Sequence, residues 1–169
     1  MSRLDAFIHR VLAQRACIDA VAANTSALTG PVLELGLGNG RTYDHLRFRF
    51  PQRDIFVFDR EVAAQPDSIP PEHLLRLGDF RATVPAYLAE GRQSAVFIHA
   101  DVGSFSKEKS VRLAADLAPT LLKILAPGAY LACDQPIALD GLERLALPDG
   151  LESGYYHLYR RQDRAATQV

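Results

Sequence analysis

The sequence predicts an α/β fold in which a mostly parallel β-sheet lies between two layers of helices. Short apolar runs at 32–35, 55–58, 74–77, 95–98 and 129–133 alternate along the chain with segments of helical periodicity. Runs of this length, each followed closely by a glycine or an acidic residue, are typical of buried parallel strands. Strands that alternate with helices favour a doubly wound sheet with helices on both faces, which is a three-layer α/β/α arrangement.

The first expected element is an amphipathic helix. Apolar residues recur at helical spacing between residues 4 and 21, and arginines fall between them. The Thr-Gly-Pro segment at 29–31 separates this helix from the first strand. A second helix is predicted from about residue 41 to residue 50, because Pro51 disfavours helical geometry in the residue before it.

The second half of the chain continues the alternation. A long helical pattern follows the fourth strand, and Pro119 is expected to kink or restart that helix. Pro127 and Gly128 then lead into the fifth strand. Residues 154–161 alternate aromatic and polar side chains, which predicts an antiparallel C-terminal strand.

Length and charge restrict the classes of protein. A chain of 169 residues is expected to form a single domain, with a leading helix in 1–28, a ligand-binding core in 30–135 and C-terminal strands in 136–169. The net charge of -1 disfavours binding to nucleic acid, and no apolar run is long enough to suggest a membrane span. A cytoplasmic protein is therefore expected. Cys17 and Cys133 lack the spacing of a disulfide framework or a zinc site and are expected to be small buried hydrophobes.

The loop after the first strand is the strongest indication of a ligand site. Gly36, Gly38 and Gly40 remove side chains where the backbone must turn and approach a ligand. Arg41 stands where a dinucleotide-binding fingerprint would have its third glycine, which disfavours a nicotinamide or flavin. Glu34 places a carboxylate beside the loop and favours a cationic ligand. Asp59, at the end of the second strand, is placed to accept hydrogen bonds from ribose hydroxyls.

Four motifs follow one another at or near the predicted strands: Glu34-Leu-Gly-Leu-Gly-Asn-Gly40, Asp59, Gly78-Asp79-Phe80 and Leu125-Ala-Pro-Gly-Ala-Tyr-Leu131. Together they resemble the successive motifs of class I S-adenosylmethionine-dependent methyltransferases, over about residues 30 to 135. The resemblance implies a Rossmann-like sheet, S-adenosyl-L-methionine as the cofactor, and methyl transfer as the activity.

The resemblance also implies roles for individual residues. The glycine loop would hold the methionine end of the cofactor, Asp59 its ribose, and Asp79 with Phe80 the edge and face of its adenine. Asp59 and Asp79 could instead be helix caps, and Phe80 could belong to the core. The complete set of expected cofactor-binding residues is Glu34, Gly36, Leu37, Gly38, Asn39, Gly40, Asp59, Arg60, Gly78, Asp79, Phe80 and His99.

The residues at the ends of the fourth and fifth strands bear on the reaction. The Asn-Pro-Pro-aromatic signature of many amino methyltransferases is absent, and no Pro-Cys nucleophile is present. Asp101 is the candidate general base, while His99 is expected to contact the cofactor. Asp101 and Asp134 also resemble the acidic positions of magnesium-dependent catechol-type O-methyltransferases, but Gln135 stands where that pattern usually has asparagine. A magnesium site is therefore a secondary possibility.

The chain lacks the inserted segments from which many methyltransferases build a substrate lid, so the acceptor is expected to be a small molecule, the alternative being a substrate that brings its own surface. Tyr155, Tyr156 and Tyr159 are proposed to lie on an edge strand that could form a homodimer surface. Two alternatives remain at this stage: a noncatalytic domain that binds S-adenosylmethionine or S-adenosylhomocysteine, and a nucleotide-dependent oxidoreductase.

Overall fold

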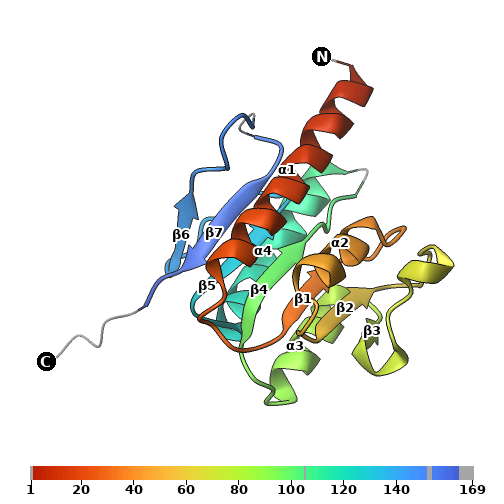
Figure 1. Cartoon of the computed structure of the whole chain (residues 1–169), viewed down its shortest axis with the longest axis vertical. Helices are drawn as coiled ribbons and strands as arrows, with labels where there is room; N and C mark the ends of the chain where they lie inside the picture. The colour runs from red at the N-terminus through yellow and green to blue at the C-terminus, as the bar shows by residue number, and fades with distance from the viewer. Residues whose placement is uncertain (1, 105, 152–153, 164–169) are drawn as a thin grey trace, which may run out of the picture.

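The computed structural model describes residues 2–104, 106–151 and 154–163 (Figure 1). Its centre is a seven-stranded sheet with the order β3-β2-β1-β4-β5-β7-β6. Strands β1 to β5 are parallel, whereas β7 pairs antiparallel with both β5 and β6. The strands are β1 (Val32–Leu35), β2 (Ile55–Asp59), β3 (Leu75–Leu77), β4 (Ala95–Ala100), β5 (Leu125–Cys133), β6 (Leu142–Leu145) and β7 (His157–Arg161).

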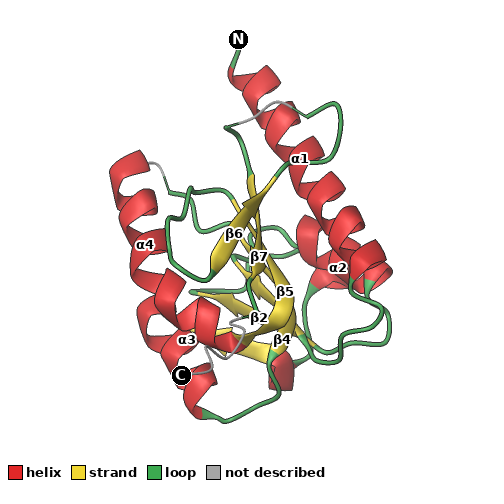
Figure 2. Cartoon of the chain, turned by 90° about the vertical axis from the view of Figure 1, so that its left-hand side faces the viewer, coloured by secondary structure: helices red, strands yellow, loops and turns green. Residues whose placement is uncertain are grey.

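In the described part of the chain, four α-helices cover the sheet in two pairs. Helices α1 and α2 lie on one face, and α3 and α4 lie on the other (Figure 2). Two short 3-10 helices, Pro66–Ser68 and Glu72–Leu74, precede β3. The α-helices are α1 (Arg3–Asn24), α2 (Arg41–Arg49), α3 (Phe80–Ala89) and α4 (Lys107–Ile124). No helix among the described residues has the length and hydropathy needed to cross a lipid bilayer.

Side-chain caps fix where three of these helices begin. Ser2 and Asp5 form a reciprocal capping box at the start of α1. Asp79 accepts a hydrogen bond from the backbone N–H of Arg81 at the start of α3, and Ser106 caps α4 in the same way. These caps satisfy backbone donors that the first helical turn leaves without partners.

Each face of the sheet has its own apolar core. Leu33 and Leu35 of β1 pack in the cluster under α3 and α4, whereas Val32 packs in the cluster under α1 and α2. This alternation follows from the two-residue period of a strand. It also puts Glu34 on the α1 and α2 side, in register with His99 of β4.

The sheet has its switch point between β1 and β4, because the chain winds outward to β2 and β3 on one side and to β5 on the other. In doubly wound sheets ligands bind beyond the carboxyl ends of the strands at this point. The loops after β1 and β4 are therefore neighbours. The hydrogen bond from Asp101 N–H to the Leu35 carbonyl binds the end of β4 to β1, and the hydrogen bond from Gly36 N–H to the Phe58 carbonyl binds the end of β1 to β2.

The expected fold class is confirmed, with several corrections in detail. Helix α4 runs through Pro119 without a restart, since the proline removes one hydrogen bond but does not end the helix. Strand β5 begins at Leu125 and contains Pro127 and Gly128, with a register shift against β4. Strand β6 was not expected, because its four residues are only half-buried or exposed and lack an apolar run.

The proposed tyrosine surface is wrong for two of its three residues. Tyr156 and Tyr159 are buried, and the phenolic oxygen of Tyr159 accepts a hydrogen bond from Ile137 N–H at 2.8 Å. Strand β7 is internal, since β5 and β6 pair with its two sides. Tyr155 precedes β7 and stacks on His9 of α1. The alternation of polar and aromatic residues could not show that another strand lies outside this one.

Candidate active site

The three glycines of the loop after β1 have different physical roles. All three have positive φ angles, of 96° at Gly36, 50° at Gly38 and 87° at Gly40. A Cβ atom at Gly36 would lie 2.3 Å from the carbonyl oxygen of Asp101, so the β4 end leaves no room for a side chain there. A Cβ atom at Gly38 would meet nothing within 4 Å. The backbone at Gly38 therefore faces open space.

Asp59 connects the end of β2 to this loop. Its Oδ2 atom accepts hydrogen bonds from the backbone N–H groups of Leu37 at 2.8 Å and Gly38 at 3.1 Å. Its Oδ1 atom accepts from the N–H of Arg60 at 2.6 Å. The carboxylate thus lies beside the open face of the loop and holds the loop backbone in place.

The loop after β3 supplies a capping carboxylate and an aromatic ring. Asp79 caps α3 and accepts a hydrogen bond from the Arg60 guanidinium at 2.9 Å. The backbone hydrogen bond from Arg81, together with Arg60, lowers the pKa of Asp79. Phe80 is the first residue of α3, and Gly78 donates its N–H to the carbonyl oxygen of Asp59 at 2.9 Å. The β3 and β2 ends are therefore bound to each other.

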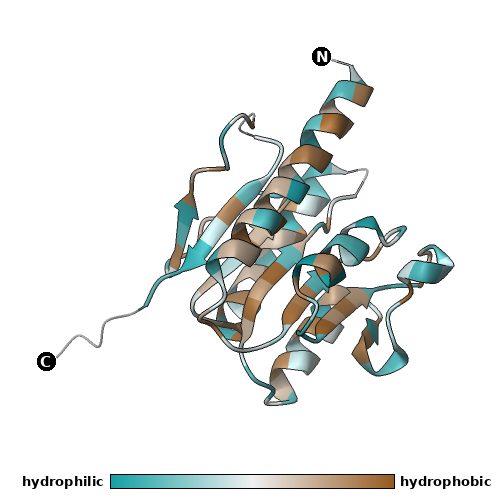
Figure 3. Cartoon of the chain, viewed as in Figure 1, coloured by the Kyte–Doolittle hydropathy of each residue, from teal (hydrophilic) through white to brown (hydrophobic). Residues whose placement is uncertain are grey.

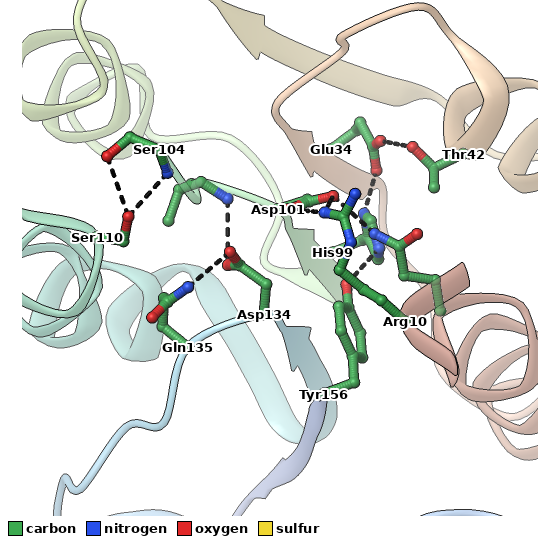
Figure 4. Close-up of polar contacts among 12 residues, drawn as sticks. Arg10, Glu34, Thr42, His99, Asp101, Ser104, Ser110, Asp134, Gln135 and Tyr156 are labelled. Atoms are coloured by element: carbon green, nitrogen blue, oxygen red, sulfur yellow. Dashed lines mark hydrogen bonds and ion pairs between the residues drawn. The ribbon is translucent and has the colours of Figure 1, made fainter. Parts of the chain in front are cut away.

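A buried chain of hydrogen bonds runs beneath the glycine loop (Figure 4). The Thr42 hydroxyl donates to Oε1 of Glu34, and Oε2 of Glu34 lies 2.6 Å from Nδ1 of His99. On the other side of the imidazole, Nε2 lies 2.5 Å from the Tyr156 hydroxyl. Glu34, His99 and Tyr156 are fully buried. The chain joins α2, β1, β4 and the segment before β7.

Burial and charge act in opposite directions on His99. Burial lowers the pKa of its imidazole, but the carboxylate of Glu34, its hydrogen bond, and the charges of Asp101 and Asp134 raise it. The net result is a raised pKa, because a protonated imidazole neutralises the buried carboxylate. Burial raises the pKa of Tyr156 well above its ordinary value, so its hydroxyl stays protonated.

Asp101 follows β4 and is held from α1. Arg10 donates from Nη1 to both carboxylate oxygens of Asp101, at 3.1 and 2.9 Å, and the Gln14 side-chain amide donates to Oδ2 at 2.7 Å (Figure 4). The Asp101 side chain keeps 22% of its surface exposed. Asp101 is thus a partly accessible carboxylate whose orientation is fixed by the leading helix.

Asp134 lies at the end of β5 and is more enclosed. Its carboxylate accepts hydrogen bonds from Val102 N–H at 3.2 Å and from the Gln135 side chain at 2.8 Å. Burial and the nearby charge of Asp101 raise the pKa of Asp134. No group of three or more His, Cys, Asp or Glu residues in the described ranges has an arrangement that could hold a metal ion. The hydrogen bonds of both carboxylates are instead provided by protein donors.

Two cavities open at the carboxyl ends of the strands. The first has a volume of about 670 Å³ and lies between the glycine loop, Asp59, Asp101 and the facing side of α1. The second has a volume of about 720 Å³ and lies between the start of α3 and the start of α4. The two cavities adjoin, because they share four of their lining residues: Asp59, Phe80, Val102 and Gly103.

A family profile described as S-adenosyl-L-methionine methyltransferase matches residues 1–161, which is almost the whole chain. The chain belongs to this family. Its members transfer methyl groups from S-adenosyl-L-methionine, so this protein is a methyltransferase and S-adenosyl-L-methionine is its cofactor. Both the nucleotide-dependent oxidoreductase and the noncatalytic binding domain are thereby set aside.

Solved methyltransferase structures agree with this assignment. The crystal structure of an S-adenosyl-L-methionine methyl transferase from Silicibacter pomeroyi DSS-3 is 47% identical to this chain, with a TM-score of 0.91. The alignment covers 95% of this chain and 99% of that one. Human methyltransferase-like protein 13 in complex with SAH shares the fold at 14% identity and a TM-score of 0.60, over 95% of this chain and 84% of that one. A search among proteins of curated function gives no match.

Several of the residues expected to bind the cofactor line the two cavities of this methyltransferase. Gly36, Leu37, Gly38, Asn39 and Asp59 line the first cavity. Arg60 lines the second, and Phe80 lines both. The backbone at Gly38 faces open space, and Asp59 lines both cavities.

The other expected residues do not line these cavities. Glu34 and His99 are fully buried and lie within hydrogen-bond distance of each other. Gly40, Gly78 and Asp79 also lie outside the cavity lining, where Gly40 packs on Ser68. The sequence pattern could not tell which side chains at the strand ends line a cavity.

The sequence patterns gave no indication that four polar residues belong to the site: Arg10, Gln14, Thr42 and Tyr156. One signal was present for the first two, because residues four apart lie on the same face of a helix. Nothing in the sequence connected that face with Asp101, which is 91 residues from Arg10.

Proposed function

We propose that this methyltransferase methylates a small-molecule acceptor in the cleft formed by the two adjoining cavities. One observation carries the proposal: each cavity has a volume typical of a site for one small ligand, and the two meet at Val102 and Gly103. Together they offer room for the cofactor and a second small molecule. The net charge of -1 is also unlike that of a protein with a nucleic-acid acceptor.

The residues proposed to hold the cofactor are those that line the cavities. The backbone at Gly36, Leu37 and Gly38 supports the methionine end, Asp59 accepts hydrogen bonds from the ribose, and Phe80 packs on the adenine. Bound S-adenosylmethionine supplies an electrophilic methyl group on a sulfonium centre. Glu34 and His99 act from beneath, by keeping the loop and β4 in register.

Asp101 is the candidate to accept the proton that a hydroxyl or amine acceptor loses. It lines the first cavity, is partly exposed and has a fixed orientation through Arg10 and Gln14. Methyl transfer depends largely on holding the two reactants in line and excluding water, so a second catalytic group is not required.

Titration calorimetry with S-adenosylmethionine and S-adenosylhomocysteine tests the cofactor assignment. We expect dissociation constants near the micromolar range for the wild type, and at least tenfold weaker binding for Asp59→Ala, because that variant loses a charge-assisted acceptor. Asp140→Ala, at an exposed residue before β6, is the matched control and should bind like the wild type. Circular dichroism checks that each variant is folded. Equal binding by Asp59→Ala and the wild type would contradict the assignment.

An acceptor screen tests the small-molecule proposal. The protein is incubated with S-adenosylmethionine and pools of small hydroxyl, amine and thiol compounds. The S-adenosylhomocysteine that methyl transfer releases is measured by mass spectrometry. Turnover with a small acceptor, lowered at least tenfold by Asp101→Asn, would support both the acceptor class and the role of Asp101. Turnover with total RNA or denatured protein and none with small compounds would overturn the acceptor class.

A further inference from the structure

The cofactor site proposed above leaves the charged methionine end of S-adenosylmethionine without a charged side chain as its partner. That end carries a carboxylate and an ammonium group, and the residues assigned to it, Gly36, Leu37 and Gly38, offer backbone groups only. Glu34, which precedes the loop, is fully buried and pairs with His99 at 2.6 Å. A charged partner for the methionine end therefore comes from another part of the first cavity.

Several charged side chains along that cavity are already engaged within the protein. Asp44 pairs with Arg47 at 2.8 Å, and His45 lies 2.8 Å from Asp19. Asp59 is the residue assigned to the ribose. The charged side chains that remain along the first cavity are Arg10, Arg15, Arg41 and Asp101.

Arg10 differs from the other two arginines because an acidic side chain holds it in place. Its Nη1 atom donates to both carboxylate oxygens of Asp101, at 3.1 and 2.9 Å (Figure 4). Arg15 and Arg41 are exposed and pair with no acidic side chain in the described ranges. Arg10 is therefore the arginine of this cavity with a fixed guanidinium.

The fixed guanidinium of Arg10 lies beside the glycine loop. The backbone of Asp101, its ion-pair partner, packs against Gly36, where a Cβ atom would lie 2.3 Å from the Asp101 carbonyl oxygen. Hydrophobic and hydrophilic residues follow one another along α1 (Figure 3), and both kinds line the cavity here, since Phe7 lies next to Arg10 in its wall. The guanidinium carbon of Arg10 is 5.8 Å from the centre of the Phe7 ring. One acidic residue and one ring thus orient Arg10 at the methionine end of the site.

Arg10 also keeps donors that a ligand can use. Only Nη1 is engaged, whereas Nε and Nη2 donate to no residue in the part of the chain that the structure describes. The side chain remains 38% exposed. A guanidinium presents its N–H groups in a planar fork that matches a carboxylate, and such charge-assisted hydrogen bonds are stronger than neutral ones.

We propose, on the basis of the cofactor site proposed above, that Arg10 of the leading helix binds the carboxylate of the methionine end of S-adenosylmethionine. The methionine end then lies between the glycine loop on one side and α1 on the other. Arg10 contacts Asp101 as well as the cofactor in this arrangement, so that bound cofactor and the candidate base share one positioning residue.

Titration calorimetry with S-adenosylmethionine and decarboxylated S-adenosylmethionine tests the proposal, because the second compound lacks only the carboxylate. We expect the wild type to bind S-adenosylmethionine at least tenfold more tightly than the decarboxylated compound. Arg10→Ala should bind S-adenosylmethionine at least tenfold more weakly than the wild type does, but the decarboxylated compound no more weakly. Arg3→Ala is the matched control, since it removes an arginine from an exposed position of the same helix outside the cavity, and it should keep the preference of the wild type.

A second variant covers the case in which Arg10→Ala, which leaves Asp101 without its ion-pair partner, does not fold by circular dichroism. Arg10→Lys keeps the charge beside Asp101 but lacks the planar fork, so it should retain only part of the preference for S-adenosylmethionine. The proposal would be overturned by an Arg10→Ala variant, or in its place an Arg10→Lys variant, with the full preference of the wild type. Loss of the preference in Arg15→Ala instead would also overturn it.

The same titrations separate this proposal from the proposed cofactor site. Binding of S-adenosylmethionine that is weakened by Asp59→Ala but unaffected by the Arg10 variants would leave the site in place and overturn only the role of Arg10. A wild type that binds neither compound would overturn both.

Discussion

The buried pair of Glu34 and His99 makes a prediction that depends on pH. Glu34→Gln keeps the shape of the side chain and an oxygen that can accept the Nδ1–H of His99, but it removes the negative charge. With the carboxylate gone, a protonated His99 would be a buried charge facing only the more distant Asp101 and Asp134 and the Tyr156 hydroxyl. The variant should therefore keep a neutral imidazole.

The sign of the pH dependence follows from linkage. The folded wild type raises the pKa of His99, so the pair contributes most to stability below the ordinary value of 6.5 and loses that contribution as pH rises through the folded pKa. In Glu34→Gln, burial instead penalises the protonated imidazole in the folded state. The free energy of unfolding should therefore differ more between the two proteins at acid pH than at alkaline pH.

The expected magnitudes come from full burial of the pair. Removing one partner of a buried ion pair lowers the free energy of unfolding by about 3–5 kcal/mol. Because Glu34→Gln retains the hydrogen bond, the expected loss at pH 6 is about 3 kcal/mol. At pH 9, where a neutral imidazole can donate to the glutamine, about 1 kcal/mol should be lost. For a chain of this length each kcal/mol corresponds to about 2–4 °C in Tm.

Urea unfolding at both pH values, followed by circular dichroism, measures these differences. Glu61→Gln, at an exposed glutamate after β2, corrects for the general effect of removing one carboxylate and should change stability by less than about 0.5 kcal/mol. If Glu34→Gln lowered the free energy of unfolding equally at the two pH values, or more at pH 9 than at pH 6, the predicted role of the buried charge pair would be refuted.

Three further predictions concern packing. In urea unfolding, Gly36→Ala should lower the free energy of unfolding by about 3 kcal/mol or more, because its Cβ would lie 2.3 Å from a backbone oxygen. Gly38→Ala should lower it by only about 1 kcal/mol, because a Cβ there meets nothing and only the positive φ is unfavourable. Equal losses in the two variants would contradict this difference. Tyr156→Phe should cost about 1–3 kcal/mol in urea unfolding by leaving the imidazole without its partner, and a loss below about 0.5 kcal/mol would contradict the buried hydrogen bond. Cys17 and Cys133 should not react with a thiol reagent for minutes until denaturant is added, since both are buried and burial raises the pKa of the Cys17 thiol to about 12.

The local part of the fold was predictable because it depends on local patterns. The apolar runs identified β1 to β5, and the helical periodicity identified α1, since burial repeats every two residues in a strand and about every 3.6 in a helix. The effect of Pro119 on α4 was wrongly predicted, and β6 was not predicted at all. A proline inside a well-packed helix need not end it, and a short outer strand needs no apolar run.

The sequence by itself determined the order of the elements, the glycine loop and the acidic residues near the strand ends, because these depend on backbone preferences along a few neighbouring residues. Only the tertiary structure decided that Glu34 bonds to His99, 65 residues away, instead of facing the cleft. It also brought Arg10 and Gln14 of the leading helix to Asp101. These contacts depend on strand register and on which helix covers which face of the sheet, and both are set by packing of the whole chain.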